Sequence, residues 1–444
     1  MTGFYRADPA RLAALVQPDR IHRDVYLDAE VFALEMERLW GRSWVYVGHA
    51  SQVPQVGDYI TTVLAGQPVF LLHQPSGELG VFMNRCAHKG AQVLLAERGN
   101  TGKLIRCPYH AWNFKLDGSL LSIPLKNDYE GSGVWDSPAG RGLARPGGVR
   151  QYRGLVFARL SAEGPGFDEY FGDVLQILDL IADRSPVGEL EVLGLPLRSE
   201  MRCNWKMYLE NVNDAVHPIS THESAAEAAR VVGDSLSGSA DHAMAMEQLL
   251  PFGAGYSFYT KMGARVLGHG HSIHGTKFSL HSGYAAIPGY AQMLQQAHGE
   301  ARATEVLSFS PQNTILYPSL ALKAGPALLR VLQPLAPDRT RLEVWALAPK
   351  GAPEALQRQV INYTRLVFSP LSVVAHDDIR LFESVQQSLR ATGNEWVSLH
   401  RGYRGQAEPA LPHEVDDGND ELLMRNQYRA WRDALSLPLA TEVA

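Results

Sequence analysis

The chain has 444 residues, of which 45% are hydrophobic and 20% charged, and its formal net charge is −6 at pH 7. This composition is typical of a globular protein of two or three domains, and the mild charge without like-charge blocks argues against nucleic acid or anionic membrane surfaces as partners. Because the chain shows no signal-peptide pattern, no apolar run of roughly 18 residues and only three cysteines, we expect a reduced, cytoplasmic protein without a membrane span.

The N-terminal part of the chain predicts a helical arm followed by a β-rich region. Residues 28–40 show helical periodicity, and short strand-like runs broken by Gly and Pro follow them. We expect residues 41–162 to form a small all-β domain. Residues 1–40 and 163–444 are expected to form a second, larger domain.

Two mixed pairs of cysteine and histidine lie within this β-rich region. They are Cys86-x-His88 and Cys107-x-x-His110, separated by eighteen residues. Structural zinc sites usually pair Cys with Cys and His with His. A Rieske [2Fe–2S] cluster instead takes two thiolates on one iron and two imidazoles on the other, which two facing loops supply if each gives one Cys and one His. We therefore expect this cluster, with a zinc site or two unrelated buried thiols as the alternatives.

The larger domain is expected to combine an antiparallel sheet with surrounding helices, so the predicted fold class is α+β. Residues 172–184 have the pattern of an amphipathic helix, and residues 341–349 read as a strand. The segment 225–290 is rich in Gly, Ser, Ala and His, and we expect a solvated or lid-like loop there in preference to a metal site. Its clustered histidines are His269, His271, His274 and His281.

A second candidate metal site lies in the stretch "NWKMYLENVNDAVHPISTH". Read as one helix, it places Glu210, Asp214 and His217 on one face beside an apolar stripe, where unpaired ionisable groups are costly. His222 follows five residues after His217, and Pro218 lets the chain turn and bring the two imidazoles together. We interpret the two histidines as metal ligands, with purely structural histidines as the alternative.

A carboxylate is needed to complete a facial triad of two histidines and one acid, which binds non-haem Fe(II) and leaves positions open for oxygen. Later in the chain, Asp378 heads an apolar helical stripe of Phe382, Val385 and Leu389, whereas Asp377 heads a more polar face. We choose Asp378 as the third ligand and keep Asp377 as the other candidate. A first-turn acid favoured by the helix dipole is the alternative without a metal.

The two halves "CAHKG" and "CPYHAW" resemble the Rieske signature of the aromatic-ring-hydroxylating oxygenases. The segments "ENVNDAVHPISTH" and "DDIRLFESVQ" resemble those that carry the mononuclear iron in that family, so the resemblance spans about residues 40–390. It implies that His217, His222 and Asp378 hold the iron. It also implies that Asp214 hydrogen-bonds to a Rieske histidine of a neighbouring subunit in a head-to-tail homotrimer, with or without a small β subunit.

The resemblance predicts a catalytic α subunit that hydroxylates, and in the first instance cis-dihydroxylates, an aromatic substrate with O₂. Since no GxGxxG follows a strand, NAD(P)H is expected to act only through a partner reductase, with or without a ferredoxin. The alternatives are a Rieske monooxygenase or O-demethylase, a non-catalytic Rieske electron carrier and a zinc-stabilised interaction protein.

The motifs look closest to family members that act on aromatic carboxylates of the benzoate, salicylate or terephthalate type. A carboxylate substrate calls for an arginine in the pocket, because the guanidinium group matches a carboxylate with two parallel hydrogen bonds. Arg330 is our candidate for this role, with a surface salt bridge as the alternative.

Overall fold

The computed structural model describes residues 3–133, 141–235, 249–278, 287–309, 311–370, 372 and 374–437. The chain divides into two compact units, Trp40–Phe167 on the one hand and Met1–Leu39 with Asp168–Ala444 on the other. The boundaries expected from the sequence, at residues 41 and 162, stay a prediction. None of the described helices is long and apolar enough to cross a membrane.

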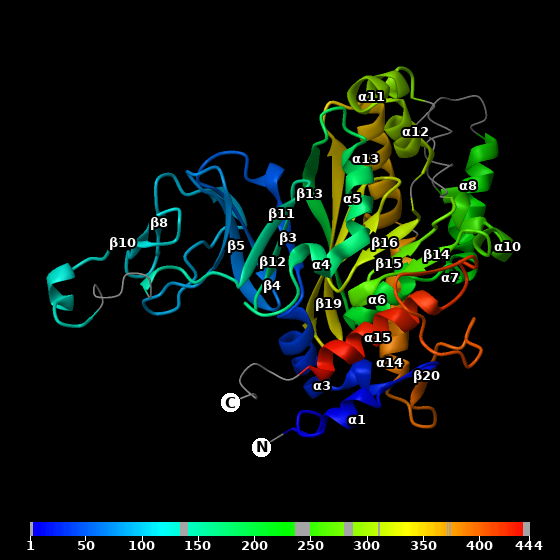
Figure 1. Ribbon diagram of the computed structural model, residues 1–444, viewed down its shortest axis with the longest axis horizontal. Coiled ribbons are helices and arrows are strands. Elements are labelled where there is room, and N and C mark those ends of the chain that lie inside the picture. The colour runs from blue at the N-terminus through cyan, green and yellow to red at the C-terminus, as the bar shows by residue number, and fades with distance from the viewer. Residues whose placement is uncertain are drawn as a thin grey trace. The chain divides into compact units, whose positions relative to one another are not determined.

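The smaller unit consists of short antiparallel strands in three sheets (Figure 1). The sheets have the orders β6-β5-β4-β7, β10-β9-β8 and β11-β12-β3. The strands are β3 (Val45–His49), β4 (Asp58–Leu64), β5 (Gln67–His73), β6 (Leu79–Met83), β7 (Arg98–Asn100), β8 (Ile105–Arg106), β9 (Asn113–Phe114), β10 (Leu120–Ser122), β11 (Gly148–Tyr152) and β12 (Leu155–Arg159).

The core of this unit lies beside the Cys/His loops. Strand β5, an inner strand of its sheet, carries a continuous apolar run, residues 69–72, and all four side chains are buried, as expected where both faces of a strand are covered. Phe70 and Phe82 belong to one buried cluster together with Cys86 and Cys107. The two cysteines are therefore part of the hydrophobic core of the smaller unit.

The larger unit is built on an eight-stranded antiparallel sheet of order β13-β19-β18-β17-β16-β15-β14-β21. Its strands are β13 (Leu190–Met201), β14 (Ala264–Val266), β15 (Ser272–His274), β16 (Asn313–Leu316), β17 (Leu320–Lys323), β18 (Leu328–Ala336), β19 (Arg339–Pro349) and β21 (His413–Val415). Strands β16, β17 and β18 lie inside the sheet; β17 and β18 are mostly apolar, and β16 is buried from Thr314 to Leu316, as expected for strands covered on both faces.

Helices pack against this sheet, as Figure 1 shows. The principal ones are α5 (Leu175–Ala182), α6 (Trp205–Val212), α7 (His217–Thr221), α8 (Glu223–Ser235), α11 (Tyr290–His298), α12 (Glu300–Ser308), α13 (Glu354–Phe368), α14 (Ala375–Ser388) and α15 (Leu422–Ser436). Helix α13 packs on β19, α6 contacts β16 and β18, and α14 contacts both α6 and β13. The predicted α+β class is confirmed.

The expected loop over residues 225–290 is wrong for much of its length. Strands β14 and β15 belong to the large sheet, and the side chains of His271 and His274 are buried. His271 accepts a hydrogen bond from the backbone N–H of Tyr317 and donates one to the carbonyl of Tyr170, so it is a structural histidine. Of the other two members of the expected cluster, His269 is exposed and His281 lies outside the described residues.

Candidate metal centre and its cavity

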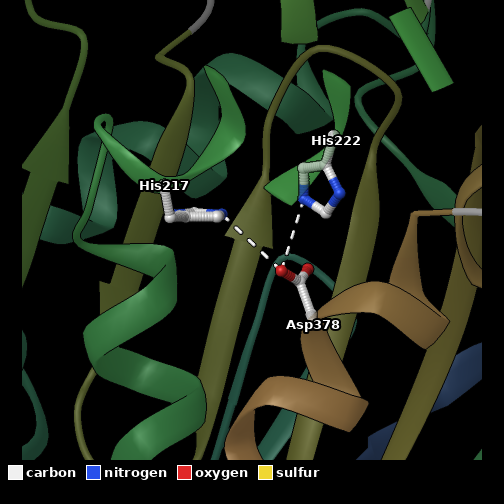
Figure 2. A group of neighbouring side chains, drawn as sticks. All are labelled: His217, His222 and Asp378. Carbon is white, nitrogen blue, oxygen red and sulfur yellow. Dashed lines mark ion pairs between the residues drawn. The ribbon is translucent and has the colours of Figure 1, made fainter. Parts of the chain in front are cut away.

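Two histidines and one aspartate come together in the larger unit. The Oδ1 atom of Asp378 lies 3.3 Å from Nε2 of His222 and 3.7 Å from Nε2 of His217 (Figure 2). One ligand atom from each of the three side chains lies within 4.8 Å of the others. Ligands bound to one ion at about 2.1 Å lie roughly 3–4 Å apart, so this group fits a single divalent metal. Among the described residues it is the one such group.

The two histidines come from a short helix that starts after a break. The expected single helix from Trp205 through His217 is wrong, because α6 ends at Val212 and α7 begins at His217. Between them, Oδ2 of Asp214 accepts hydrogen bonds from the backbone N–H groups of Val216 and His217, at 2.9 and 2.7 Å. These hydrogen bonds fix the turn between the two helices, and α7 starts at His217 after that turn.

Pro218 lies in the first turn of α7, where its missing N–H is not needed, so it starts this helix and does not end the preceding one. His217 opens α7 and His222 follows its last residue. Their ring centroids are 5.6 Å apart, with the ring planes nearly perpendicular at 80°. The expectation that the chain near Pro218 brings the two imidazoles together is confirmed, although by a different local geometry.

The acid comes from the first turn of α14, far along the chain. Asp378 joins the group of three, whereas Asp377 approaches only Nδ1 of His222, at 3.7 Å, and its side chain is 37% exposed. The expected apolar stripe below Asp378 holds only in part, since Phe382 is buried but Val385 is 44% exposed. The geometry therefore favours Asp378 over Asp377 as the metal ligand. It is stronger evidence for this choice than the apolar stripe in the sequence.

Asn211, which sequence reasoning did not single out, links the metal-binding side chains. Its Nδ2 donates a hydrogen bond of 3.1 Å to Oδ1 of Asp378 and lies 3.0 Å from Nε2 of His217. It belongs to the last turn of α6, so it ties that helix to α7 and α14. No periodicity marks an asparagine of this kind, and only the three-dimensional contact identifies it.

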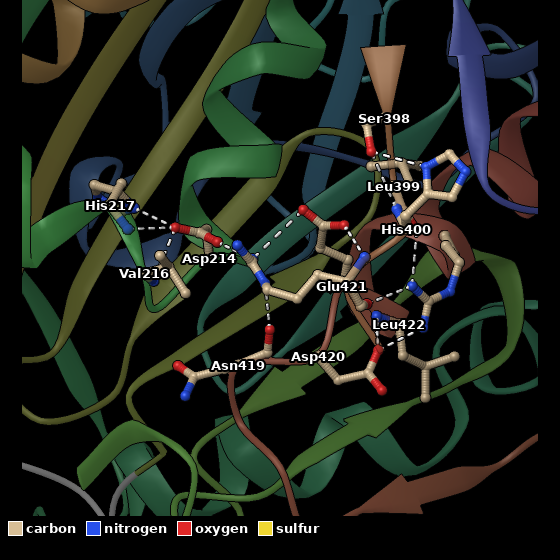
Figure 3. Close-up of polar contacts among 12 residues, drawn as sticks. Asp214, Val216, His217, Ser398, Leu399, His400, Asn419, Asp420, Glu421 and Leu422 are labelled. Atoms are coloured by element: carbon tan, nitrogen blue, oxygen red, sulfur yellow. Dashed lines mark hydrogen bonds and ion pairs between the residues drawn. The ribbon is translucent and has the colours of Figure 1, made fainter. Parts of the chain in front are cut away.

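Asp214 lies behind His217 in a polar network (Figure 3). The Nδ1–H group of His217 donates to its Oδ2 at 3.0 Å, and the guanidinium of Arg401 donates to its Oδ1. Arg401 in turn donates to the carbonyl of Asn419 and pairs with Glu421. Burial raises the pKa of Asp214, but the hydrogen bonds from His217 and the charge of Arg401 outweigh it and hold this pKa well below its usual range. Asp214 is therefore an anion that fixes the orientation of His217.

Glu210, expected on the same helical face, has a different role. Its Oε1 accepts hydrogen bonds from the hydroxyl groups of Tyr26 and Tyr428. Burial raises the pKa of Glu210 to about 7, although these two hydrogen bonds act in the opposite direction. Glu210 thus connects α6 to α15 and to the N-terminal segment, and it is not among the residues grouped around a metal position.

The group of three lines a cavity of about 940 Å³, including the space at its open mouth. Apolar side chains make up much of the wall, among them Val212, Leu342, Val344, Phe368 and Phe382. Such a wall, with a few polar groups placed within it, is typical of a site for a small organic molecule.

Arg330 also lines this cavity, and its side chain is only 6% exposed. It donates hydrogen bonds to Oδ1 of Asn313 at 2.8 Å and to the carbonyl of Leu322 at 3.1 Å. No described carboxylate forms an ion pair with it. The alternative of a surface salt bridge is therefore wrong, because Arg330 extends from β18, an inner strand of the sheet.

The four Cys/His residues of the smaller unit occupy two similar loops. In each loop the backbone N–H of the cysteine donates to a carbonyl five residues later, Cys86 to Ala91 at 2.7 Å and Cys107 to Trp112 at 2.9 Å. The φ angle of Gly90 is +78°, a conformation that favours glycine and allows the first loop to close.

These residues fit a Rieske cluster. Both cysteines are buried and their thiols are adjacent, whereas His88 is half-buried and His110 exposed, with ring centroids 4.7 Å apart. Burial raises the pKa of Cys86, and the neighbouring Cys107 raises it further, so a metal is needed to hold two thiolates here. The Nδ1 atom of His88 is buried without a hydrogen-bond partner among the described residues, as expected for a ligand atom without its metal.

Comparison with known proteins agrees with both sites. Residues 43–138 match the family model of the Rieske [2Fe-2S] domain, and residues 191–437 match that of the ring hydroxylating alpha subunit (catalytic domain). The alpha subunit of toluate 1,2-dioxygenase from Pseudomonas putida is 30% identical over 433 residues, which cover 94% of this chain and 91% of that protein. The large subunit of anthranilate 1,2-dioxygenase from Acinetobacter baylyi is 30% identical over 421 residues, covering 92% and 86%.

Among solved structures, naphthalene 1,2-dioxygenase with indole bound in the active site has the same fold, with a TM-score of 0.78 and 22% identity, covering 96% of this chain and 95% of that one. The fold and the two sites define an oxidoreductase with a Rieske domain and a non-haem metal centre. The chain belongs to the α subunits of the Rieske-type ring-hydroxylating oxygenases. This family implies a [2Fe–2S] cluster and a mononuclear iron, and it excludes the electron-carrier and zinc-protein alternatives.

Proposed function

We propose that this chain is the terminal oxygenase component that cis-dihydroxylates an aromatic carboxylate with O₂. The observation that carries the proposal is that His217, His222 and Asp378 line the same cavity as the buried Arg330. When bound, a ferrous ion held by two imidazoles and one carboxylate supplies open coordination positions for dioxygen, and a Rieske cluster supplies electron storage. The similarity to proteins named for toluate and anthranilate, both aromatic carboxylates, supports the substrate class.

We assign the mononuclear iron to His217, His222 and Asp378. Asp214 accepts the Nδ1 proton of His217, which leaves Nε2 of that ring unprotonated and available to the iron. The amide of Asn211 holds the carboxylate of Asp378 towards the two histidines. The Rieske cluster is assigned to Cys86, His88, Cys107 and His110.

The apolar wall and Arg330 are assigned to the substrate. Val212, Leu342, Val344 and Phe382 exclude water from the ring and pack against it. The guanidinium of Arg330 binds the carboxylate and so fixes which edge of the ring lies nearest the iron.

We assign the supply of electrons to a partner reductase that oxidises NAD(P)H, with or without a ferredoxin, because the sequence lacks a dinucleotide-binding motif. The assembly is proposed to be a homotrimer, with or without a small β subunit, in which Asp214 hydrogen-bonds to a Rieske histidine of the neighbouring subunit.

Turnover under ¹⁸O₂ tests the proposal. The purified protein is supplied with a compatible reductase, NADH and a panel of benzoate, salicylate, anthranilate, terephthalate and a methoxybenzoate. Two ¹⁸O atoms in a cis-diol product are expected. One ¹⁸O atom indicates monohydroxylation, release of formaldehyde from a methoxy-substituted substrate indicates demethylation, and no product from any arene with both metal sites loaded contradicts the proposal.

The assignment of Arg330 is tested by Arg330→Ala, with Arg390→Ala as the control because Arg390 forms an exposed ion pair with Asp338. Arg330→Ala should raise KM for the carboxylate by about 10- to 100-fold and keep both metal sites loaded. An unchanged KM would rule out Arg330 as the anchor.

A further inference from the structure

Lys323 is a second cation in the cavity, and neither the sequence motifs nor the metal group account for it. It is the last residue of β17, it lines the cavity together with the candidate iron ligands, and it is only 4% exposed. Its Nζ lies 5.8 Å from the ring centroid of Tyr363. Within the described part of the chain, Lys323 has neither a hydrogen-bond partner nor an ion-pair partner.

The strand register places Lys323 beside Arg330. Lys323 pairs with Leu328 across β17 and β18, so these two side chains share one face of the sheet. Leu328 and Arg330 are two residues apart on the same strand and also share a face. Lys323 and Arg330 are therefore diagonal neighbours on the cavity side of the sheet, where such pairs are typically about 7–8 Å apart.

This pair of cations is costly without an anion. Burial lowers the pKa of Lys323 well below its ordinary value, and the nearby charge of Arg330 lowers it further. The Nε atom of Arg330 is buried and has no hydrogen-bond partner among the described residues. A buried charge without a counter-ion is unfavourable, so two adjacent basic groups indicate a position that an anionic ligand completes.

The acids that line the cavity have other partners. Asp214 is held by His217 and Arg401, and Asp378 lies against the two histidines and Asn211. Neither forms an ion pair with Lys323. The described cavity therefore contains two basic side chains that no described carboxylate pairs with, next to an apolar wall, and a bound anion would restore the charged form of Lys323.

We propose that Lys323 and Arg330 together form an anion subsite, and that Lys323 selects arenes bearing a carboxylate or sulfonate over neutral arenes of the same size. The inference rests on the proposed function and extends it, because it adds a specificity-determining residue and a discrimination by charge. The anionic group lies between the two cations while the ring packs against the apolar wall.

Equilibrium binding to the metal-loaded protein tests this subsite. The probes are matched pairs of equal size: benzoate with benzamide, salicylate with salicylamide, and terephthalate with terephthalamide. The variants are Lys323→Met, Lys323→Arg and the control Lys350→Met, since Lys350 pairs with Glu189 at the surface, away from the cavity. Iron content and the visible absorption of the cluster are checked in every variant.

We expect the wild-type protein to bind at least one carboxylate more tightly than its amide. Lys323→Met should weaken the binding of that carboxylate by about 10- to 100-fold, because one charged hydrogen bond is lost. The affinity for the matched amide should stay within about twofold of the wild-type value. Lys323→Arg should retain most of the affinity, and Lys350→Met should behave as wild type. In turnover, Lys323→Met should raise KM with little change in kcat, as expected for loss of uniform binding.

Two results would overturn the anion subsite: amides that bind as tightly as every matched carboxylate, or carboxylate affinity unchanged in Lys323→Met. Either result can occur in a protein that still hydroxylates neutral arenes with both metal sites loaded, so the oxygenase proposal would survive it. Failure of the oxygenase proposal has a different signature, namely no hydroxylation of any arene by the loaded protein.

Discussion

Replacing Asp378 with asparagine should remove the mononuclear iron and leave the Rieske cluster intact. Oδ1 of Asp378 is the oxygen that lies near both histidines, at 3.3 and 3.7 Å. The substitution preserves shape but removes the only negative charge in the group of three. Loss of residues that merely support a metal ligand typically weakens metal binding about 10- to 100-fold, so loss of the charge on a ligand should exceed about 100-fold, or ~2.7 kcal/mol.

The matched control is Asp377→Asn, which makes the same replacement of a carboxylate oxygen by an NH2 group in the neighbouring acid. Iron is counted per chain after extensive dialysis, and the cluster is followed by its visible absorption. Wild type and Asp377→Asn should hold about three irons, and Asp378→Asn about two. A third iron retained by Asp378→Asn, or lost from Asp377→Asn instead, would contradict the assignment of Asp378 as the ligand.

Three further outcomes are expected. Cys107→Ser should lose the visible absorption of the cluster and about two irons while keeping the mononuclear iron; a variant that keeps the absorption would contradict the ligand assignment. Lys206→Met leaves the fully buried carboxylate of Glu35 without its ion-pair partner and should lower the free energy of unfolding in denaturant by about 3–5 kcal/mol, whereas a loss below about 1 kcal/mol would show that the N–H donors of the neighbouring tryptophans suffice. Burial lowers the pKa of His271 to about 3, so the folded state binds fewer protons than the unfolded state between that pH and about 6.5, and stability present above pH 6.5 is lost as the pH falls. From pH 7 to pH 5 this one group should cost wild type about 2 kcal/mol more than His271→Gln, measured as the difference in unfolding free energy, and equal losses in the two proteins would contradict the shift.

The parts of the site that sequence patterns predict are those confined to short segments. Cys86 and His88 lie on one loop and Cys107 and His110 on the next, so their spacing alone indicates two facing loops. His217 and His222 lie at the two ends of a single short helix. Local spacing of this kind survives errors in the surrounding secondary structure, as the interrupted helix before His217 illustrates.

The parts that sequence patterns miss depend on contacts between distant segments. Arg401 reaches Asp214 from 187 positions away, and no pattern in the chain links them. Asn211 and Lys323 are ordinary polar residues in sequence, and their importance follows from where the sheet and α6 place them. The sequence pattern favours a surface salt bridge for Arg330 over a role in the cavity, whereas the structure buries its side chain.

The fold class follows from the alternation of apolar runs with helical patterns, but the limits of individual elements do not. His271 and His274 lie in a Gly-rich, Ser-rich stretch that predicts a loop. In the structure, part of this stretch pairs with neighbouring strands and belongs to the large sheet. Pairing with a neighbouring strand supplies hydrogen bonds that a local propensity cannot indicate.

The central claim is that one polypeptide carries two separate iron centres, and metal analysis combined with EPR tests it most directly. Protein purified without oxygen should contain about three irons per chain and, on reduction, show the EPR signal of a Rieske cluster. A folded protein that is colourless and free of iron, or that contains zinc in place of iron, would contradict this account.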